Sequence, residues 1–205
     1  MGFFANILFY ALLSCSHAND DQLIINKLGD NIGFEFKFEQ KNFYKFLKAP
    51  KITTGKALFS NPSSFVWEVA GDNAVKIVSN GKRTWIYSPP EEEGDTPSLA
   101  VRDGSFGDGI QSLILGSKYK VCDLKQAKGK KGFKELRVKG SKDKGYIWAT
   151  ITFADGSDFR LDSVEFEDKD GSKVLIQVRD FKRLSKKVAA KTFVFKAPKG
   201  TRIIQ

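Results

Sequence analysis

Side chains suited to nucleophilic, redox or metal chemistry are scarce in this sequence. One histidine, His17, and two cysteines, Cys15 and Cys122, occur among 205 residues. A histidine can act as a general base, and a cysteine thiolate can act as a nucleophile or a metal ligand. Two of these three residues lie within residues 1–18. Whether such chemistry is possible therefore depends on the fate of that segment.

Residues 1–18 have the pattern of a secretory signal peptide. Phe3 to Leu13 is an apolar run without charge, and Ser16-His17-Ala18 fits a cleavage site with small residues. Cleavage after Ala18 would leave residues 19–205 as a single domain without histidine, in which Cys122 is an inert thiol. That excludes Ser-His-Asp, Cys-His and histidine–zinc sites. We expect an exported binding protein that is not an enzyme and needs no metal or cofactor, although carboxylate or lysine catalysis stays open in principle.

The same segment permits a different processing. Leu12-Leu13-Ser14-Cys15 resembles the lipobox of bacterial lipoproteins, whose cysteine becomes the lipid-bearing first residue. Lipidation of Cys15 would anchor the protein in the outer membrane instead of releasing it to the periplasm. Both outcomes stay open at the level of sequence.

The remaining chain alternates apolar and charged residues with the period of a β-strand. Phe34, Phe36 and Phe38 alternate with charged neighbours, which is typical of a strand with one buried face. Asn80-Gly81 and Asp170-Gly171 are typical of tight hairpin turns. About ten short strands are predicted in this way, which indicates a mainly β, antiparallel sheet rolled into a barrel or half-barrel. Besides 34–39 they cover residues 55–60, 65–69, 75–79, 84–87, 119–124, 133–138, 146–153, 159–166, 174–181 and 192–195.

Two short helices interrupt this pattern. One is predicted over residues 20–29, and the other over 108–115, where Ile110, Leu113 and Ile114 follow helical spacing. The second lies inside a long connection, Ser88 to Ser117. A connection with its own apolar helix can be a lid over a functional site, or it can plug one end of a barrel.

Basic residues are concentrated in one stretch. The net charge of the chain is +10, and residues 118–144 alone contain eleven basic against three acidic residues. The lysines cluster at expected turns, 129–132 and 141–145, which is typical of solvated hairpin tips. A basic edge that faces acidic lipid headgroups or an acidic partner is the alternative. Nucleic-acid binding is not expected, because the lysines are not interleaved with exposed aromatic residues.

Phenylalanine dominates the aromatic content, with 18 Phe against 3 Trp and 5 Tyr. In one interpretation these rings fill a core. In the other, a rolled sheet of this size encloses more volume than its side chains fill and binds an apolar ligand. The rings placed on expected strands are Phe36, Phe38, Phe59, Phe65, Trp67, Trp85, Tyr87, Phe193 and Phe195.

Four segments resemble the periplasmic outer-membrane lipoprotein carrier proteins, the LolA family. Residues 38–40 (FEQ) resemble its first-strand Phe-x-Gln, and residues 55–67 (GKALFSNPSSFVW) its Gly-x-aromatic-x-x-x-Pro-x-x-Phe-x-Trp segment. Residues 78–89 (VSNGKRTWIYSP) are similar to its Val-Ser-Asp-Gly-Lys-x-x-Trp-x-Tyr-x-Pro hairpin. Residues 193–200 (FVFKAPKG) resemble its terminal Phe-x-Phe-x-x-Pro-x-Gly. Their order and spacing cover nearly all of residues 19–205.

The resemblance implies an unclosed antiparallel β-barrel with a short helical lid over an apolar cavity. It implies a monomeric carrier that takes the acyl chains of lipoproteins from an inner-membrane lipoprotein-releasing transporter to an outer-membrane receptor lipoprotein, LolB. The cavity positions correspond to Phe65, Trp67 and Ile77, and the strand alternation places Val69 on the same face as Phe65 and Trp67. Leu113 and Ile114 would stand on the lid.

One position departs from the family pattern. Asn61 stands where family members often carry an arginine before the proline, which helps to hold the lid and to set the direction of transfer. An amide cannot replace its charge-assisted hydrogen bonds, so looser closure or a substitute base is expected. Besides the carrier, two alternatives remain: a LolB-like receptor lipidated on Cys15, and a partner-binding sensor module that docks through 118–144.

Overall fold

The computed structural model describes residues 33–60, 64–71, 74–104, 114, 120–140, 146–154, 160–168 and 170–204. The expected signal peptide, the helix at 20–29 and Asn61 lie outside the described residues. Of the expected lid helix 108–115, only Ile114 is described, and Leu113 lies outside the described residues.

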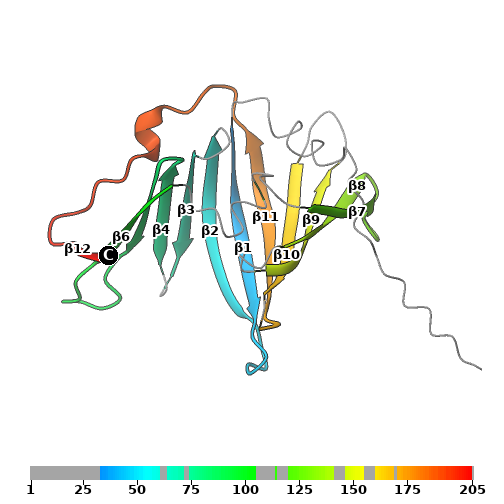
Figure 1. The fold of residues 1–205 in the computed structure, drawn as a ribbon, viewed down its shortest axis with the longest axis horizontal. Helices are drawn as coiled ribbons and strands as arrows, with labels where there is room; N and C mark the ends of the chain where they lie inside the picture. Colours follow the sequence, from blue (N-terminus) through cyan, green and yellow to red (C-terminus); the bar gives the residue numbers. More distant parts are fainter. Residues whose placement is uncertain are drawn as a thin grey trace, which may run out of the picture.

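Twelve strands form one sheet, in the spatial order β12-β6-β5-β4-β3-β2-β1-β11-β10-β9-β8-β7 (Figure 1). Neighbouring strands are antiparallel except for β12, which lies parallel to β6. The sheet ends at β12 and β7, so it is unclosed, as the resemblance predicts. The strands are β1 (Phe34–Phe43), β2 (Lys51–Ser60), β3 (Ser64–Ala70), β4 (Val75–Asn80), β5 (Arg83–Ser88), β6 (Ser98–Asp103), β7 (Lys120–Gln126), β8 (Phe133–Lys139), β9 (Tyr146–Ala154), β10 (Arg160–Asp168), β11 (Lys173–Arg183) and β12 (Arg202–Ile204).

Three expectations need correction. The connection 88–117 contains β6, which pairs with β5 along its whole length. The strand expected at 192–195 is wrong, because the 3-10 helix η1 (Ala190–Phe193) occupies its start and Phe193 packs on the sheet instead of pairing with an edge. The last strand is β12, which follows later in the chain. Cys122 of β7 is disulfide-bonded in the chain of residues 1–205, whose only other cysteine is Cys15, whereas the inert thiol is expected for residues 19–205 alone.

Two predicted hairpins are confirmed, and the chemistry of their turns explains them. Gly81, in the turn between β4 and β5, has a φ of +83°, a backbone conformation that residues with a Cβ rarely adopt. The Oδ1 atom of Asn80 accepts hydrogen bonds from the backbone amides of Lys82 and Arg83, at 3.0 and 2.8 Å. The turn at Asp170-Gly171 joins β10 to β11 in the same way, with Gly171 at a φ of +79°.

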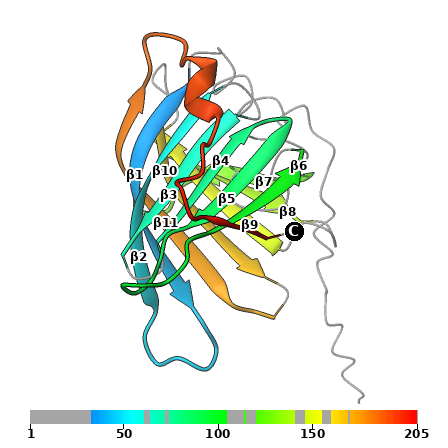
Figure 2. The same ribbon diagram turned by 90° about the vertical axis from the view of Figure 1, so that its left-hand side faces the viewer.

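The sheet bends so that its two halves face one another across an inner face. In Figure 2 the strands near its two ends, β6 and β8, lie on the same side of β1. The alternation in β1 points Phe34, Phe36 and Phe38 inward, where they join one continuous cluster with side chains from β8, β9, β10 and β11. The members from the second half are Leu136, Val138, Tyr146, Ala149, Ile151, Phe153, Leu161, Val164 and Ile176.

The outer face carries a second, smaller apolar layer. Val78, Trp85 and Leu99 face outward, because the register pairs Trp85 with Val78 and Tyr87 with Leu99 on the face opposite to Phe65 and Trp67. The C-terminal segment crosses this layer, with Phe193 buried and Phe195 beside Tyr87 at 5.1 Å between ring centroids (Figure 2). The aromatic residues that the sequence groups together are thus divided between two faces.

Candidate functional site

The four strand residues predicted to contact acyl chains lie together on the inner face. Phe65 and Trp67 of β3 are buried, with 1% and 3% of their surface exposed. Val69 follows two residues later, and Ile77 of β4 pairs with Trp67 across the strands. Val69 and Ile77 are half-buried and pack against the same cluster. Their common placement agrees with the strand alternation.

The predicted residues are part of a larger group of stacked rings. Trp67 stacks on Phe38 at 4.2 Å between centroids and meets Phe36 and Phe59 edge-on at 6.2 and 6.5 Å. Phe59, which is fully buried, stacks on Phe65 at 5.8 Å. Sequence reasoning placed these additional rings on strands without assigning them to the site. The alternation of Phe34, Phe36 and Phe38 with charged residues is a signal that points to two of them, Phe36 and Phe38.

A glycine leaves room for the closest pair of rings. Gly55 of β2 lies opposite Phe38 in the register of β1 and β2. A Cβ atom at this position would collide with the ring of Phe38 and with the carbonyl oxygen of Glu68. Gly55 therefore allows the Phe38 ring to lie flat against Trp67, and it is the glycine of the segment 55–67 that resembles the LolA family.

Ile114 is the described residue of the expected lid helix, and it is helical. Its side chain is 2% exposed and belongs to the same cluster as Phe65 and Trp67. Ile114 therefore packs against the inner face rather than standing away from it. The structure brings five of the six predicted acyl-contact residues into one cluster, while Leu113 lies outside the described residues.

Among the described residues, few polar groups lie on the inner face. The hydroxyl of Thr84 lies within hydrogen-bond distance of the Ser79 hydroxyl, at 3.1 Å, and of the backbone oxygen of Gly104, at 3.0 Å, so this buried pair is satisfied internally. The hydroxyl of Tyr146 has no hydrogen-bond partner among the described residues, and burial raises the pKa of its phenol to about 12. Within the described part of the chain no group of His, Cys, Asp and Glu could hold a metal ion. The inner face is therefore apolar, and its rings pack against one another as a buried cluster.

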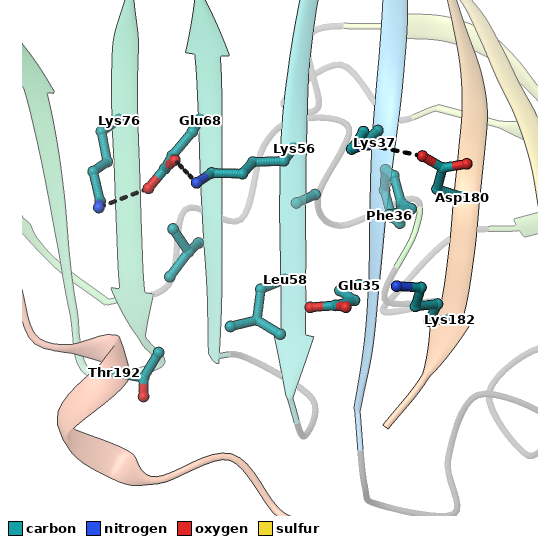
Figure 3. A pocket seen from close by; sticks show the side chains of 12 residues that line it. Glu35, Phe36, Lys37, Lys56, Leu58, Glu68, Lys76, Asp180, Lys182 and Thr192 are labelled. Carbon is teal, nitrogen blue, oxygen red and sulfur yellow. Dashed lines mark ion pairs between the residues drawn. The ribbon is translucent and has the colours of Figure 1, made fainter. Parts of the chain in front are cut away.

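A pocket of about 390 Å³ lies on the opposite, outer face (Figure 3). Its floor includes Leu58 and Val66, and Thr192 of η1 lies at one side. The carboxylate of Glu68 is ion-paired with Lys76 at 2.6 Å and with Lys56 at 2.8 Å. Partial burial would raise the pKa of Glu68, but the hydrogen bonds from both lysines outweigh it and lower that pKa.

Most of the charge around this outer pocket is compensated within the protein. Lys37 lies 2.9 Å from Asp180, and Figure 3 shows this pair beside the Lys56–Glu68–Lys76 group. Three of the four lysines and two of the three carboxylates that line the pocket are ion-paired in this way. We therefore assign the candidate site to the inner face and not to this pocket.

The described part of the basic stretch, residues 120–140, forms β7, β8 and the exposed turn between them. Lys128, Lys130 and Lys131 lie on the turn between β7 and β8, and Lys130 is ion-paired with Asp162. The guanidinium of Arg137 lies 4.6 Å from the ring centroid of Trp148 on the neighbouring strand β9. Part of the expected basic excess is thus compensated or stacked within the protein.

Taken together, the fold and site define an unclosed antiparallel β-sheet protein whose inner face is lined with aromatic and aliphatic side chains. Among the described residues, no helix has the length and hydropathy to cross a bilayer. The sequence pattern of the family described as outer membrane lipoprotein carrier protein LolA matches residues 32–196. This protein belongs to that family.

Relatives named "Outer-membrane lipoprotein carrier protein" are similar over most of the chain. One from Xanthomonas oryzae pv. oryzae is 24% identical over 183 residues, which cover 84% of this chain and 81% of the relative. One from Azotobacter vinelandii is 29% identical over 157 residues, covering 75% and 72%. Among solved structures, an uncharacterised conserved protein from Thermus thermophilus has a TM-score of 0.57 at 12% identity, with 91% of this chain and 99% of that one covered. This last likeness shows the fold alone.

Proposed function

We propose that this protein is an exported periplasmic carrier that binds the acyl chains of lipoproteins on its inner face and moves them from the inner to the outer membrane. The observation that supports this most directly is the continuous apolar cluster around Phe65 and Trp67, inside a sheet of the lipoprotein carrier family. Its role is binding without catalysis. An inner-membrane transporter would load the carrier, and an outer-membrane receptor lipoprotein would unload it.

The energetics of acyl chains explain why such a face is needed. Each CH₂ group buried in a membrane contributes about 0.8 kcal/mol, so one long chain is held by on the order of 10 kcal/mol. A carrier must replace most of this burial with apolar walls of its own, because the chain cannot cross water unprotected. The clustered rings of β1, β2 and β3 supply such walls.

Access to these walls requires movement of Ile114. Its side chain packs against the ring cluster, so an acyl chain reaches Phe65 and Trp67 when Ile114 is displaced. We propose that Ile114 and Leu113 then contact the chain as the apolar side of a lid. Asn61 at the lid-holding position would make that displacement easier than a charged arginine would.

The test measures binding of a fluorescent fatty-acyl probe by the purified protein and by two matched variants of β3. Val69→Asp places a carboxylate at the half-buried rim of the inner face, whereas Val66→Asp places one on the outer face of the same strand. We expect Val69→Asp to weaken probe binding about tenfold or more, since the loss of two buried methyl groups at about 0.8 kcal/mol each already exceeds the roughly 1.4 kcal/mol of a tenfold change. Val66→Asp should bind like the original protein. No probe uptake by the original protein, or equal loss in both variants, would contradict acyl binding on the inner face.

Native mass spectrometry of gently purified protein examines the cargo itself. Acylated polypeptides that co-purify with the original chain and are lost from Val69→Asp would support the carrier role. Consistent absence of such cargo under conditions that preserve other carrier complexes would argue against it.

The receptor alternative predicts a covalent difference. Leu12-Leu13-Ser14-Cys15 is the feature that favours it. Labelling of cells with a radioactive fatty acid should leave the carrier unlabelled, whereas a LolB-like receptor would be labelled and Cys15→Ser would remove the label. Label on the original chain that disappears in Cys15→Ser would replace the carrier proposal with the receptor.

A further inference from the structure

The β1–β2 tip, which we define as residues 43–52, exposes an unusual amount of apolar surface. Figure 1 and Figure 2 show this hairpin reaching beyond the other turns at the same end of the sheet. Phe46 at its centre is 81% exposed, the highest value among the large exposed hydrophobic residues that the structure describes. Five such residues share this one tip: Phe43, Tyr44, Phe46, Leu47 and Ile52.

The tip holds its rings outward in a defined arrangement. The backbone amide of Leu47 donates a 3.1 Å hydrogen bond to the carbonyl oxygen of Tyr44, which closes the turn. The rings of Tyr44 and Phe46 stack with centroids 5.5 Å apart. Below the turn, Asn42 pairs with Lys51 and Phe43 pairs with Lys173, so both sides of the hairpin continue into the sheet. The exposed rings are therefore presented by a built element.

Positive charge accompanies these rings. Lys45, Lys48 and Lys51 lie within the tip, and the sequence contains no acidic residue between Glu39 and Glu68. Lys48 and Lys51 form no ion pair with any described residue. The lysines at the tip thus outnumber the carboxylates, and two of them remain available to an external anion.

The neighbouring β10–β11 turn carries carboxylates that offset part of the positive charge of the tip. Lys45 lies against Gly171 there, and its charge is among the causes that lower the pKa of Asp170 to about 2, the hydrogen bond with Asp168 being the largest. Lys45 is therefore balanced by this turn, and the outward charge of the tip rests on Lys48 and Lys51.

This combination matches the chemistry of one kind of surface. Aromatic side chains prefer the boundary between headgroups and hydrocarbon, and lysines beside them are attracted to anionic headgroups. We propose that the β1–β2 tip docks on the surface of an anionic phospholipid bilayer, with Phe46 and Leu47 inserted and Lys48 and Lys51 at the phosphates. This goes beyond the carrier function, and it does not depend on acyl binding by the inner face.

Co-sedimentation of the purified protein with vesicles tests the docking. Vesicles of phosphatidylcholine with phosphatidylglycerol are compared with vesicles of phosphatidylcholine alone. Phe46→Ser should lower partitioning to the anionic vesicles about tenfold, from the lost burial of one aromatic ring. Its matched control is Ile203→Ser on β12, where the side chain is 67% exposed on a different part of the sheet. This control should leave partitioning unchanged.

A second pair of variants separates local from overall charge. Lys48→Glu with Lys51→Glu should lower partitioning to anionic vesicles about tenfold or more, because each lysine near such a surface is worth about 1 kcal/mol. The control, Lys128→Glu with Lys131→Glu on the β7–β8 turn, makes the same change in net charge and should have little effect. Equal losses in both pairs would show unspecific attraction of a basic protein and would overturn the proposal.

Insertion itself is measured with a tryptophan placed in the tip. The fluorescence of Phe46→Trp should be quenched by vesicles with brominated acyl chains. For Ile203→Trp, the quenching should not exceed that of the native tryptophans alone. Absence of vesicle binding by the original protein would overturn the proposal. So would self-association that Phe46→Ser abolishes, because a second copy would then cover the tip. Phe46→Ser should keep acyl-probe binding, so failure of docking and failure of the carrier function are distinguishable.

Discussion

Replacement of Trp67 by alanine is the sharpest perturbation of the inner face. Trp67 is 3% exposed and stacks on Phe38 at 4.2 Å. Its ring also meets Phe36 and Phe59 edge-on, so the substitution removes contacts from three neighbouring rings. Because the surrounding strands are held by the sheet, we expect the vacated volume to remain largely as a cavity.

The expected loss in the free energy of unfolding is about 3–5 kcal/mol, the usual range for a large aromatic residue truncated in a core. Domains of ordinary stability unfold with about 5–15 kcal/mol, so the variant should still fold but with a narrow margin. For a chain of this size, each kcal/mol shifts the melting temperature by about 2–4 °C. A decrease in melting temperature on the order of 10 °C follows from these two ranges.

Urea denaturation followed by circular dichroism measures this loss. Trp85→Ala is the matched control, because Trp85 is half-buried on the outer face and should cost about 1–2 kcal/mol. Trp67→Phe keeps an aromatic ring and serves if the alanine variant does not fold. Equal losses at Trp67 and Trp85 would refute the reasoning, since they would mean that the inner rings are no more tightly packed than the outer layer.

Three further outcomes are expected. Gly55→Ala should lower the free energy of unfolding by about 1–3 kcal/mol in urea, because its Cβ would collide with the Phe38 ring and the Glu68 carbonyl. Glu68→Gln should cost less than about 1 kcal/mol at neutral pH. The pKa of Glu68 is lowered from its ordinary 4.5, so its charge stabilises the folded state above that pH, and the difference between the two proteins should vanish in urea titrations as the pH falls through the folded-state pKa. Tyr146→Phe removes a buried hydroxyl without a described partner, so calorimetry should find its stability unchanged or raised by up to about 1 kcal/mol.

Alternate residues of one strand lie in different environments on the two faces of the sheet. Along β3, Phe65, Trp67 and Val69 face the inner cluster, while Val66 and Glu68 face the outer pocket. A substitution at alternate positions of one strand therefore separates acyl binding from outer-face packing. This is why neighbouring residues of β3 provide the matched pair of variants for the binding test.

Much of the fold could be predicted from the sequence because strand alternation and turn residues depend only on residues close together in the chain. Period-two alternation identifies β1 and β3, since successive side chains of a strand must point to opposite faces. Asn80-Gly81 identifies a hairpin because the turn needs a positive φ, which the structure has at Gly81. The grouping of Phe65, Trp67 and Val69 follows from the same alternation.

Other features depend on contacts between distant segments, which local patterns do not contain. Phe193 and Phe195 alternate like strand residues, yet they cover the outer face, and it is β12 that pairs with the edge of β6. The strand β6 gains its pairing from β5, and the rings of Trp67 and Phe38 meet across β2 where Gly55 leaves room. The β1–β2 tip shows the same limit. Its aromatic residues resemble core residues in sequence, and only the tertiary structure leaves them exposed, because the hairpin extends past the sheet that would otherwise bury them.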